Sequence, residues 1–320
     1  MGRAARVCLV CVLLTGCAHL PPQVQAPKRP SSLPTELAAY YADPGAPRDM
    51  TVYPVRDQGR VRELLVRFPL SADGFEPTEP VVEFEWFEST APGRRPAIVF
   101  NPILGGDYPL ERGICRFLAD HGFHVALVHR KTLKLSPEHD VARLELLLRQ
   151  AVVRIRQVVD WMASNERVDA ERMGSFGISM GGIASVITAA VEPRLKAHVV
   201  SLAGGDLPEI IATSNDPLLA KPRAAYLAAQ HLDAKTLEAR LRETLRTDPI
   251  RLAPYVDASR VLMIITLFDR TVGTSNELRL WRALGKPRAA FLPLGHYTAY
   301  LSLPYLNRLS LRFFRDRLGS

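Results

Sequence analysis

The sequence predicts an α/β fold in which a mostly parallel, doubly wound sheet has helices on both faces. Short apolar segments rich in β-branched residues alternate with longer segments of helical periodicity, notably 141–164. This alternation is typical of parallel strands joined by crossover helices. One segment, 206–258, interrupts the alternation with an amphipathic helical repeat. We expect this segment to be a helical cap over the functional face of the sheet. The alternative is an excursion of the chain that only packs against the domain.

The expected strands follow in chain order. The first two, 61–70 and 81–87, should form an antiparallel edge that leads into the parallel part of the sheet. Parallel strands are expected at 98–101, 124–130, 173–177, 197–202, 261–268 and 289–294. We expect all of these strands to belong to a single domain over 36–320, because single α/β domains of nearly 300 residues occur.

The segment 173–182, MGSFGISMGG, indicates a strand that runs into a sharp turn and then a helix, with Ser179 at the apex. A serine in this position is exposed above the sheet, where its hydroxyl can attack an electrophilic carbon. Gly177 and Gly181 flank it, and we expect that neither position has room for a Cβ. Ser179 is therefore the predicted nucleophile.

A carboxylate and an imidazole follow in the order Ser, Asp, His. Asp269 comes directly after the apolar run 261–268, and His296 follows the predicted strand 289–294. With these motifs the chain resembles the α/β-hydrolase superfamily from about residue 81 onward, near dienelactone hydrolases and related esterases. Asp206 follows the preceding predicted strand and is the rival acid, since some hydrolases of this fold take their acid from there.

The resemblance implies a role for each residue. His296 would accept the proton of Ser179, and Asp269 would orient the imidazole. The backbone amide of Met180 should donate to the oxyanion. The second donor should be Ile103 or Leu104, because Pro102 has no N–H. The loop 101–107, NPILGGD, departs from the family pattern, in which a His-Gly pair is common after this strand.

The N-terminus predicts export and lipidation. Arg3 and Arg6 precede an apolar stretch, 7–14, that is too short to span a bilayer, so 1–16 is expected to be a signal peptide. Leu-Thr-Gly-Cys at 14–17 resembles the bacterial lipobox, which makes Cys17 the expected lipidation site. Residues 17–35 would then be a lipidated, proline-rich tether. Ala18, in place of an aspartate, favours the outer membrane, with the domain facing the periplasm.

The composition limits which metals, cofactors and macromolecular partners are expected. Of the four cysteines, only Cys115 lies beyond residue 17, and we expect it to be a buried apolar residue. The cysteines and histidines lack metal-ligand spacing, and the sequence has neither a phosphate loop nor a dinucleotide fingerprint, so we expect no metal and no cofactor. The formal charge of +8 comes without interleaved aromatic residues, which argues against nucleic acid as a partner. His124, His129 and His139 are interpreted as structural or surface residues.

These observations predict a membrane-anchored serine hydrolase that acts on a small-molecule or lipid-like acyl substrate. The same machinery cleaves esters, amides, thioesters and lactones, so the sequence does not separate these bonds. Two alternatives stay open. One is an acyltransferase, in which an alcohol replaces water; the other is a hydrolase-derived scaffold that no longer turns over. The sequence does not indicate an oligomeric state.

Overall fold

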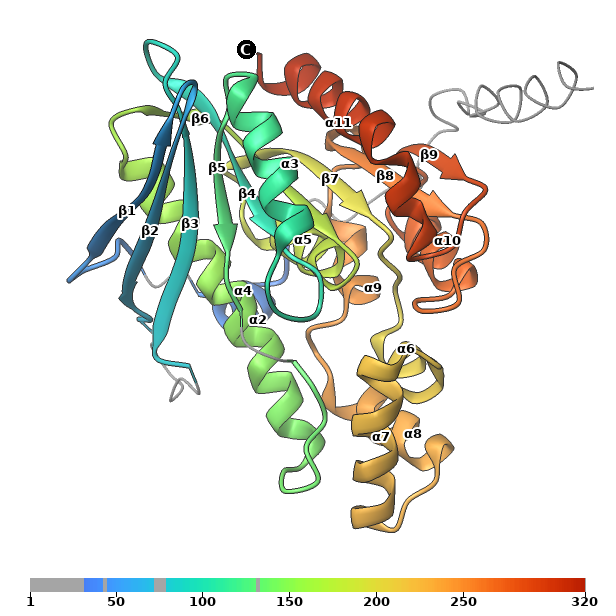
Figure 1. The fold of residues 1–320 in the computed structure, drawn as a ribbon. Helices are drawn as coiled ribbons and strands as arrows, with labels where there is room; N and C mark the ends of the chain where they lie inside the picture. Colours follow the sequence, from blue (N-terminus) through green and yellow to red (C-terminus); the bar gives the residue numbers. More distant parts are fainter. Residues whose placement is uncertain (1–31, 43–44, 72–78, 131–132, 320) are drawn as a thin grey trace, which may run out of the picture.

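The computed structural model describes residues 32–42, 45–71, 79–130 and 133–319. A nine-stranded sheet runs through the molecule, with helices on both of its faces (Figure 1). Among the described residues, no helix combines the length and the apolar character that a membrane crossing requires. The predicted signal peptide, Cys17 and most of the predicted tether lie outside the described residues.

The strand order is β1-β2-β3-β5-β4-β6-β7-β8-β9. β1, β2, β3 and β5 pair in antiparallel fashion, and β5 through β9 pair in parallel. The predicted antiparallel edge and parallel remainder are therefore confirmed. The strands are β1 (Thr51–Gln58), β2 (Val61–Pro69), β3 (Val81–Ser89), β4 (Arg95–Asn101), β5 (His124–Val128), β6 (Val168–Ile178), β7 (Leu195–Ser201), β8 (Val261–Thr266) and β9 (Arg288–Leu292).

The helices cover the sheet in two layers, α3 and α11 on one face and α4, α5 and α10 on the other (Figure 1). Alternate residues of each central strand belong to different layers. Ile98 and Phe100 of β4 pack with α3 and α11, whereas Ala97 and Val99 pack with α4. These helices are α3 (Pro109–Asp120), α4 (Val141–Ser164), α5 (Met180–Val191), α10 (Thr274–Ala283) and α11 (Leu303–Leu318).

One strand was missed, and several predicted strand boundaries differ from the structure by a few residues. β1 was not predicted, because its sequence TVYPVRDQ contains a proline and charged residues at an exposed edge. β8 ends at Thr266, two residues before the predicted end. Leu267 and Phe268 continue the apolar run in a turn after β8, where their backbone N–H groups still donate to Leu292 and Leu294 but the residues are 41% and 65% exposed. Periodicity alone does not reveal where an apolar run leaves the sheet.

The interrupting segment folds as helices between β7 and β8. They are α6 (Leu207–Thr213), α7 (Pro217–Gln230), α8 (Ala234–Thr244) and α9 (Pro249–Leu252). α7 and α8 extend away from the sheet beyond the ends of its strands, beside the long helix α4 (Figure 1). All four helices follow an N-cap aspartate whose side chain accepts a backbone N–H, at Asp206, Asp216, Asp233 and Asp248. The short α2 (Thr35–Tyr40) packs against α4 through Tyr40, whose hydroxyl donates to Glu145 at 2.7 Å.

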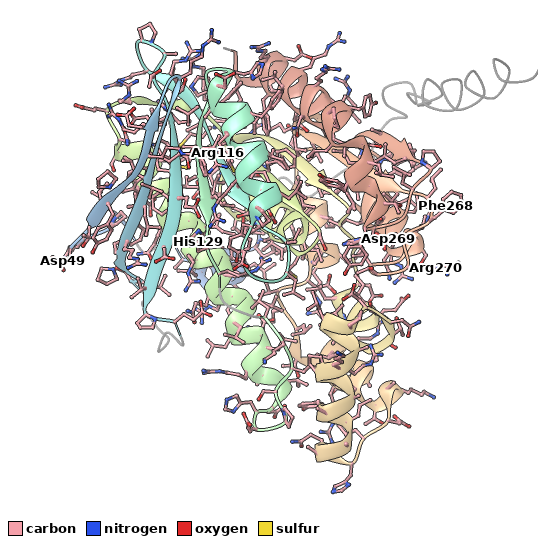
Figure 2. All side chains as sticks on the ribbon, in the orientation of Figure 1. Asp49, Arg116, His129, Phe268, Asp269 and Arg270 are labelled. Atoms are coloured by element: carbon pink, nitrogen blue, oxygen red, sulfur yellow. The ribbon has the colours of Figure 1, made fainter. Side chains whose placement is uncertain are left out.

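Of the three histidines singled out in the sequence, His124 begins β5, His129 follows the last residue of β5, and His139 precedes α4. Figure 2 shows His129 on the β3–β5 side of the sheet, well separated from Asp269. Its two ring nitrogens lie 2.7 and 2.8 Å from carboxylate oxygens of Glu83 and Glu85. Burial alone would lower the pKa of His129, but these two carboxylates raise it above its ordinary value. Cys115 is fully buried, as predicted, and burial raises the pKa of its thiol well above the ordinary value.

Candidate active site

Ser179 lies at the turn between β6 and α5. Its φ of 55° is a left-handed value that a residue with a side chain rarely adopts. The flanking glycines permit this turn: a Cβ on Gly177 would overlap the backbone of Gly181, and one on Gly181 would overlap the backbone of Asn101. The turn therefore brings the first residues of α5 against the end of β4, and it presents the Ser179 hydroxyl beyond the sheet.

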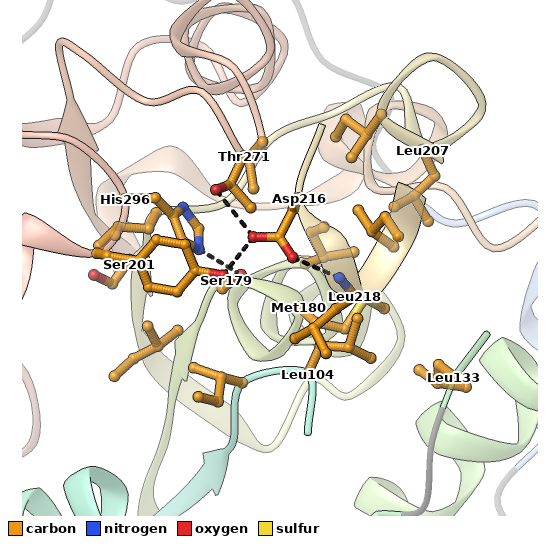
Figure 3. A pocket seen from close by; sticks show the side chains of 18 of the residues that line it. Leu104, Leu133, Ser179, Met180, Ser201, Leu207, Asp216, Leu218, Thr271 and His296 are labelled. Carbon is orange, nitrogen blue, oxygen red and sulfur yellow. Dashed lines mark hydrogen bonds between the residues drawn. The ribbon is translucent and has the colours of Figure 1, made fainter. Parts of the chain in front are cut away.

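The structure brings the three predicted side chains into one hydrogen-bonded line. His296 Nε2 lies 3.0 Å from Ser179 Oγ, and His296 Nδ1 lies 2.6 Å from Asp269 Oδ2 (Figure 3). The residues come from three separate loops, since Asp269 lies three residues beyond β8 and His296 four beyond β9. A serine, an imidazole and a carboxylate at these distances can relay a proton from the hydroxyl to the imidazole.

Several hydrogen-bond donors surround the Asp269 carboxylate. Its Oδ1 accepts the backbone N–H groups of Thr271 at 2.7 Å and Val272 at 2.8 Å. Burial opposes its ionisation, but the hydrogen bond and charge of His296, together with the backbone donors, hold the pKa of Asp269 well below its ordinary value. The carboxylate is therefore ionised at neutral pH and favours the imidazole tautomer that carries the proton on Nδ1.

Asp206, the rival acid, is engaged elsewhere. It is the N-cap of α6, and its carboxylate lies 3.0 Å from Arg242 and 2.5 Å from Arg279. Its Oδ1 also accepts the N–H of Glu209 at 3.2 Å. The imidazole of His296 bonds to Asp269 and not to Asp206. The geometry therefore favours Asp269 over Asp206.

A second carboxyl group lies behind Asp269. Glu277, near the start of α10, is fully buried, and its two oxygens accept the backbone N–H and the hydroxyl of Thr266 at 3.0 and 2.7 Å. The same hydroxyl lies 3.2 Å from Asp269 Oδ2. Burial and the neighbouring Asp269 raise the pKa of Glu277 to about 9. Glu277 is therefore protonated at neutral pH, which leaves a single negative charge beside His296.

The loop after β4 faces the Ser179 turn. The N–H of Ile103 donates to Glu111 Oε1 at 3.2 Å, so this candidate oxyanion donor already has a partner. Arg130 Nη2 donates to the carbonyl oxygens of Pro102 and Ile103, both at 2.6 Å. The N–H of Leu104 donates to no described residue. Met180 is the first residue of α5, where a backbone N–H has no partner inside the helix.

An apolar pocket of about 280 Å³ opens at Ser179. Figure 3 shows His296, Asp216 and Thr271 on one side of Ser179, with Leu104, Met180 and Leu218 close to it. The helical segment 206–258 contributes part of the wall, from α6 and the first turns of α7. The apolar wall residues are mostly leucine and isoleucine: Ile103, Leu104, Leu110, Leu133, Leu135, Leu144, Leu148, Ile178, Met180, Ile183, Leu202, Leu207, Ile210, Ile211, Leu218, Leu219, Leu303 and Leu306. This lining suits an apolar group more than a charged one.

Several residues of the site were not predicted from the sequence. Glu111, Arg130, Asp216, Glu277 and Tyr297 act on it through contacts that join segments distant in the chain. Only Tyr297 carried a local signal, because it follows His296 directly. Among the described residues, no group of three or more His, Cys, Asp and Glu side chains could hold a metal ion.

Sequence comparisons find two kinds of relative. A family model described as PETase, PET hydrolase-like, matches residues 109–215, a range that includes Ser179 but neither Asp269 nor His296. Two uncharacterized proteins of Mycobacterium tuberculosis, from strains CDC 1551 / Oshkosh and ATCC 25618 / H37Rv, are 25% identical over 158 residues. Each match covers 48% of this chain and 35% of the relative, so this chain corresponds to about a third of the length of those proteins.

Solved structures share the fold across most of the chain. Acetyl xylan esterase 1 from Thermoanaerobacterium sp. JW/SL YS485 is 18% identical with a TM-score of 0.62, over 88% of this chain and 96% of its own. An acetyl xylan esterase from Paenibacillus sp. R4 is 17% identical with a TM-score of 0.67, over 92% of this chain and 97% of its own. A cold-adapted esterase from an Arctic intertidal metagenomic library is 15% identical, with a TM-score of 0.54, over 82% of this chain and 96% of its own. The mostly parallel sheet, the serine turn and these matches show that the chain has the α/β-hydrolase fold.

Proposed function

We propose that this protein is a serine hydrolase that cleaves a carboxylic ester through an acyl-enzyme. The observation that carries the proposal is the hydrogen-bonded line from Ser179 through His296 to Asp269 at the mouth of an apolar pocket. The PET hydrolase-like match and the esterases of the same fold support ester hydrolysis.

The geometry assigns each step to a side chain. His296 Nε2 removes the proton of Ser179 as Oγ attacks the ester carbonyl, and then delivers it to the departing alcohol. Asp269 holds the imidazole and stabilises its charged form. The oxyanion would bind the N–H groups of Met180 and Leu104, since that of Ile103 is taken by Glu111. Water activated by His296 then releases the acid.

The pocket suggests a neutral ester with an apolar group next to the carbonyl. The names of the related proteins mention PET and acetyl xylan, but leucine and isoleucine side chains dominate the wall here. Each methylene buried in such a pocket contributes about 0.8 kcal/mol, or about fourfold in kcat/KM. A panel of p-nitrophenyl esters from acetate to laurate should therefore rise in kcat/KM with chain length and fall once the pocket is full.

A fluorophosphonate probe tests the nucleophile directly. The wild-type protein should be labelled on Ser179, and Ser179→Ala should abolish both labelling and ester turnover while leaving the thermal unfolding midpoint nearly unchanged. Ser164→Ala, at the C-terminal end of α4, is the matched control and should label normally. Wild-type protein that resists the probe would support the scaffold alternative. Labelling of another serine would overturn the assignment. Product analysis with added alcohols separates hydrolysis from acyl transfer.

We also propose that the chain is a lipoprotein of the bacterial cell envelope, anchored at Cys17. The support is the sequence alone: the arginines at 3 and 6, the short apolar stretch, the Leu-Thr-Gly-Cys motif and the proline-rich residues behind it. Wild-type protein should incorporate a fatty-acid analogue, and Cys17→Ser should not. A chain that starts near Ser31 behind a simple secretory signal should stay fully active on water-soluble esters. Wild-type protein that takes up no label would contradict the anchor and leave the hydrolase proposal intact.

A further inference from the structure

The turn between α6 and α7 makes three hydrogen bonds to the loops that carry Asp269 and His296. Ser214 Oγ donates to the carbonyl of Thr271 at 2.7 Å. Asp216 Oδ2 accepts the hydroxyl of Thr271 at 3.3 Å and, more closely, the hydroxyl of Tyr297. Asp216 is thus the point at which the cap, the acid loop and the histidine loop meet. Figure 3 shows its carboxylate between Thr271 and the Ser179 side of the pocket.

Both partners of Asp216 are directly connected to the proposed catalytic residues. The backbone N–H of Thr271 donates to Asp269 Oδ1 at 2.7 Å. Tyr297 follows His296 in the chain, and its ring meets the imidazole edge-on, with centroids 5.5 Å apart and an interplanar angle of 76°. A shift of either partner would therefore move a donor of Asp269 or the ring packed against His296.

Helix capping does not account for these contacts. Asp216 caps α7 through one oxygen, Oδ1, which accepts the N–H of Leu218 at 2.9 Å. Asp233 caps α8 in the same way, by accepting the N–H of Thr236 at 2.7 Å, without contact to either loop. Within the described part of the chain, the other oxygen of Asp216 accepts hydrogen bonds only from Thr271 and Tyr297.

The environment of Asp216 makes these hydrogen bonds costly to lose. The residue is 6% exposed in a largely apolar pocket, and the described part of the chain places no basic side chain within ion-pair distance of it. A buried carboxylate without a counter-ion depends on hydrogen-bond donors. Burial and the neighbouring Asp216 raise the pKa of Tyr297 to about 12, so its hydroxyl is protonated at neutral pH and donates.

We propose that Asp216 is a positioning residue that holds Thr271 and Tyr297 in place. Through these two residues it keeps Asp269 and His296 correctly oriented toward Ser179 when the cap, residues 206–258, packs against the two loops. This inference rests on the proposed serine hydrolase function. It makes turnover depend on a cap residue that does not react itself. Displacing the α6–α7 turn would release both loops together, because one carboxylate oxygen serves both.

Four variants test this role: Asp216→Ala, Asp216→Asn, Tyr297→Phe and the double variant Asp216→Ala/Tyr297→Phe. We expect kcat to fall about 100-fold in Asp216→Ala and about 10-fold in Tyr297→Phe, with KM changed less than threefold, since misplacement of reacting groups by about 1 Å has effects of this size. Asp216→Asn keeps one acceptor oxygen and replaces the other by an NH2 donor, so it can retain either the helix cap or the two loop contacts, and its kcat should lie between those of wild type and Asp216→Ala. The double variant should be no slower than Asp216→Ala, because the two changes remove one shared interaction.

Controls separate positioning from stability. Asp233→Ala removes a cap of the same kind and should lower the unfolding midpoint while leaving kcat unchanged, and Tyr53→Phe, on the exposed edge strand β1, should change neither. Each rate is divided by the concentration of active sites, which is measured by titration with the fluorophosphonate probe. Hydrogen exchange provides a readout without turnover: the backbone amides of 269–273 and 295–299 should exchange faster in Asp216→Ala than in Asp233→Ala.

The outcomes distinguish this proposal from the one on which it rests. If wild-type protein is labelled and active, two results would overturn the positioning role alone. One is a kcat of Asp216→Ala equal to that of wild type, and the other is a loss of kcat in the double variant equal to the product of the two single losses. If wild-type protein is neither labelled nor active, the hydrolase proposal fails. Hydrogen exchange then still decides whether Asp216 holds the two loops, and unchanged exchange in Asp216→Ala would overturn that as well.

Discussion

The turn that carries Ser179 and the loop that faces it, residues 101–107, are built in opposite ways. The conformation of the turn is encoded by its own residues, because Gly177 and Gly181 leave room for a left-handed serine between a strand and a helix. The facing loop has no regular structure after Asn101, and two side chains from other elements, Glu111 of α3 and Arg130 after β5, hold its backbone. One half of the site is thus specified locally and the other by distant contacts.

This difference explains what the sequence could predict. A Gly-x-Ser-x-Gly pattern between an apolar strand and a small-residue helix is a local signal, and the structure places Ser179 where that signal predicts it. Residues 101–107 left Ile103 and Leu104 equally plausible as oxyanion donors. What separates them is a carboxylate at position 111, on the first turn of another helix. No spacing rule connects these positions, because their contact depends on how α3 packs.

The largest effect expected beyond loss of the nucleophile is at the acid. Asp269→Asn should lower kcat by about 10⁴, because an amide stabilises the wrong imidazole tautomer. Asp206→Asn should change kcat less than tenfold, since Arg242 and Arg279 engage that carboxylate and the imidazole does not. Steady-state rates on one ester decide between them. A reversal, with Asp206→Asn the slower enzyme, would show that Asp206 and not Asp269 orients His296.

The facing loop offers the next largest effect. Replacing residue 104 by its α-hydroxy acid analogue changes the backbone N–H into an ester oxygen and keeps the side chain. Loss of one oxyanion donor costs about 10²–10³ in kcat. The same replacement at residue 103 should cost much less, because that N–H donates to Glu111. Turnover numbers corrected for labelled sites measure both. If residue 103 gives the larger loss, Glu111 must release the Ile103 amide when substrate binds.

Helix α10 also contributes a contact at Asp269. Glu277 approaches Asp269 through the hydroxyl of Thr266, from a position eight residues further along the chain. The apolar run before Asp269 predicted a buried strand and an acid at its end. A second buried carboxyl group is not expected from sequence, because a glutamate near the start of a helix is usually exposed. The structure tolerates it by keeping it protonated and hydrogen-bonded.

Glu277 should therefore leave a signature in the pH dependence of stability. The pKa of Glu277 is raised to about 9, whereas an unfolded glutamate titrates near 4.3. Between these values the folded protein keeps a proton that the unfolded chain has lost. The contribution of Glu277 to the free energy of unfolding is therefore fully present at low pH and disappears as the pH rises toward 9, at up to about 1.4 kcal/mol per pH unit.

Glu277→Gln imitates the protonated side chain and should remove this decline. Urea unfolding of both proteins at intervals from pH 5 to 9 measures the difference, and Glu138→Gln, an exposed glutamate, serves as the control. If the two curves run parallel, Glu277 is ionised in the folded protein, and Asp269 would then share its surroundings with a second negative charge.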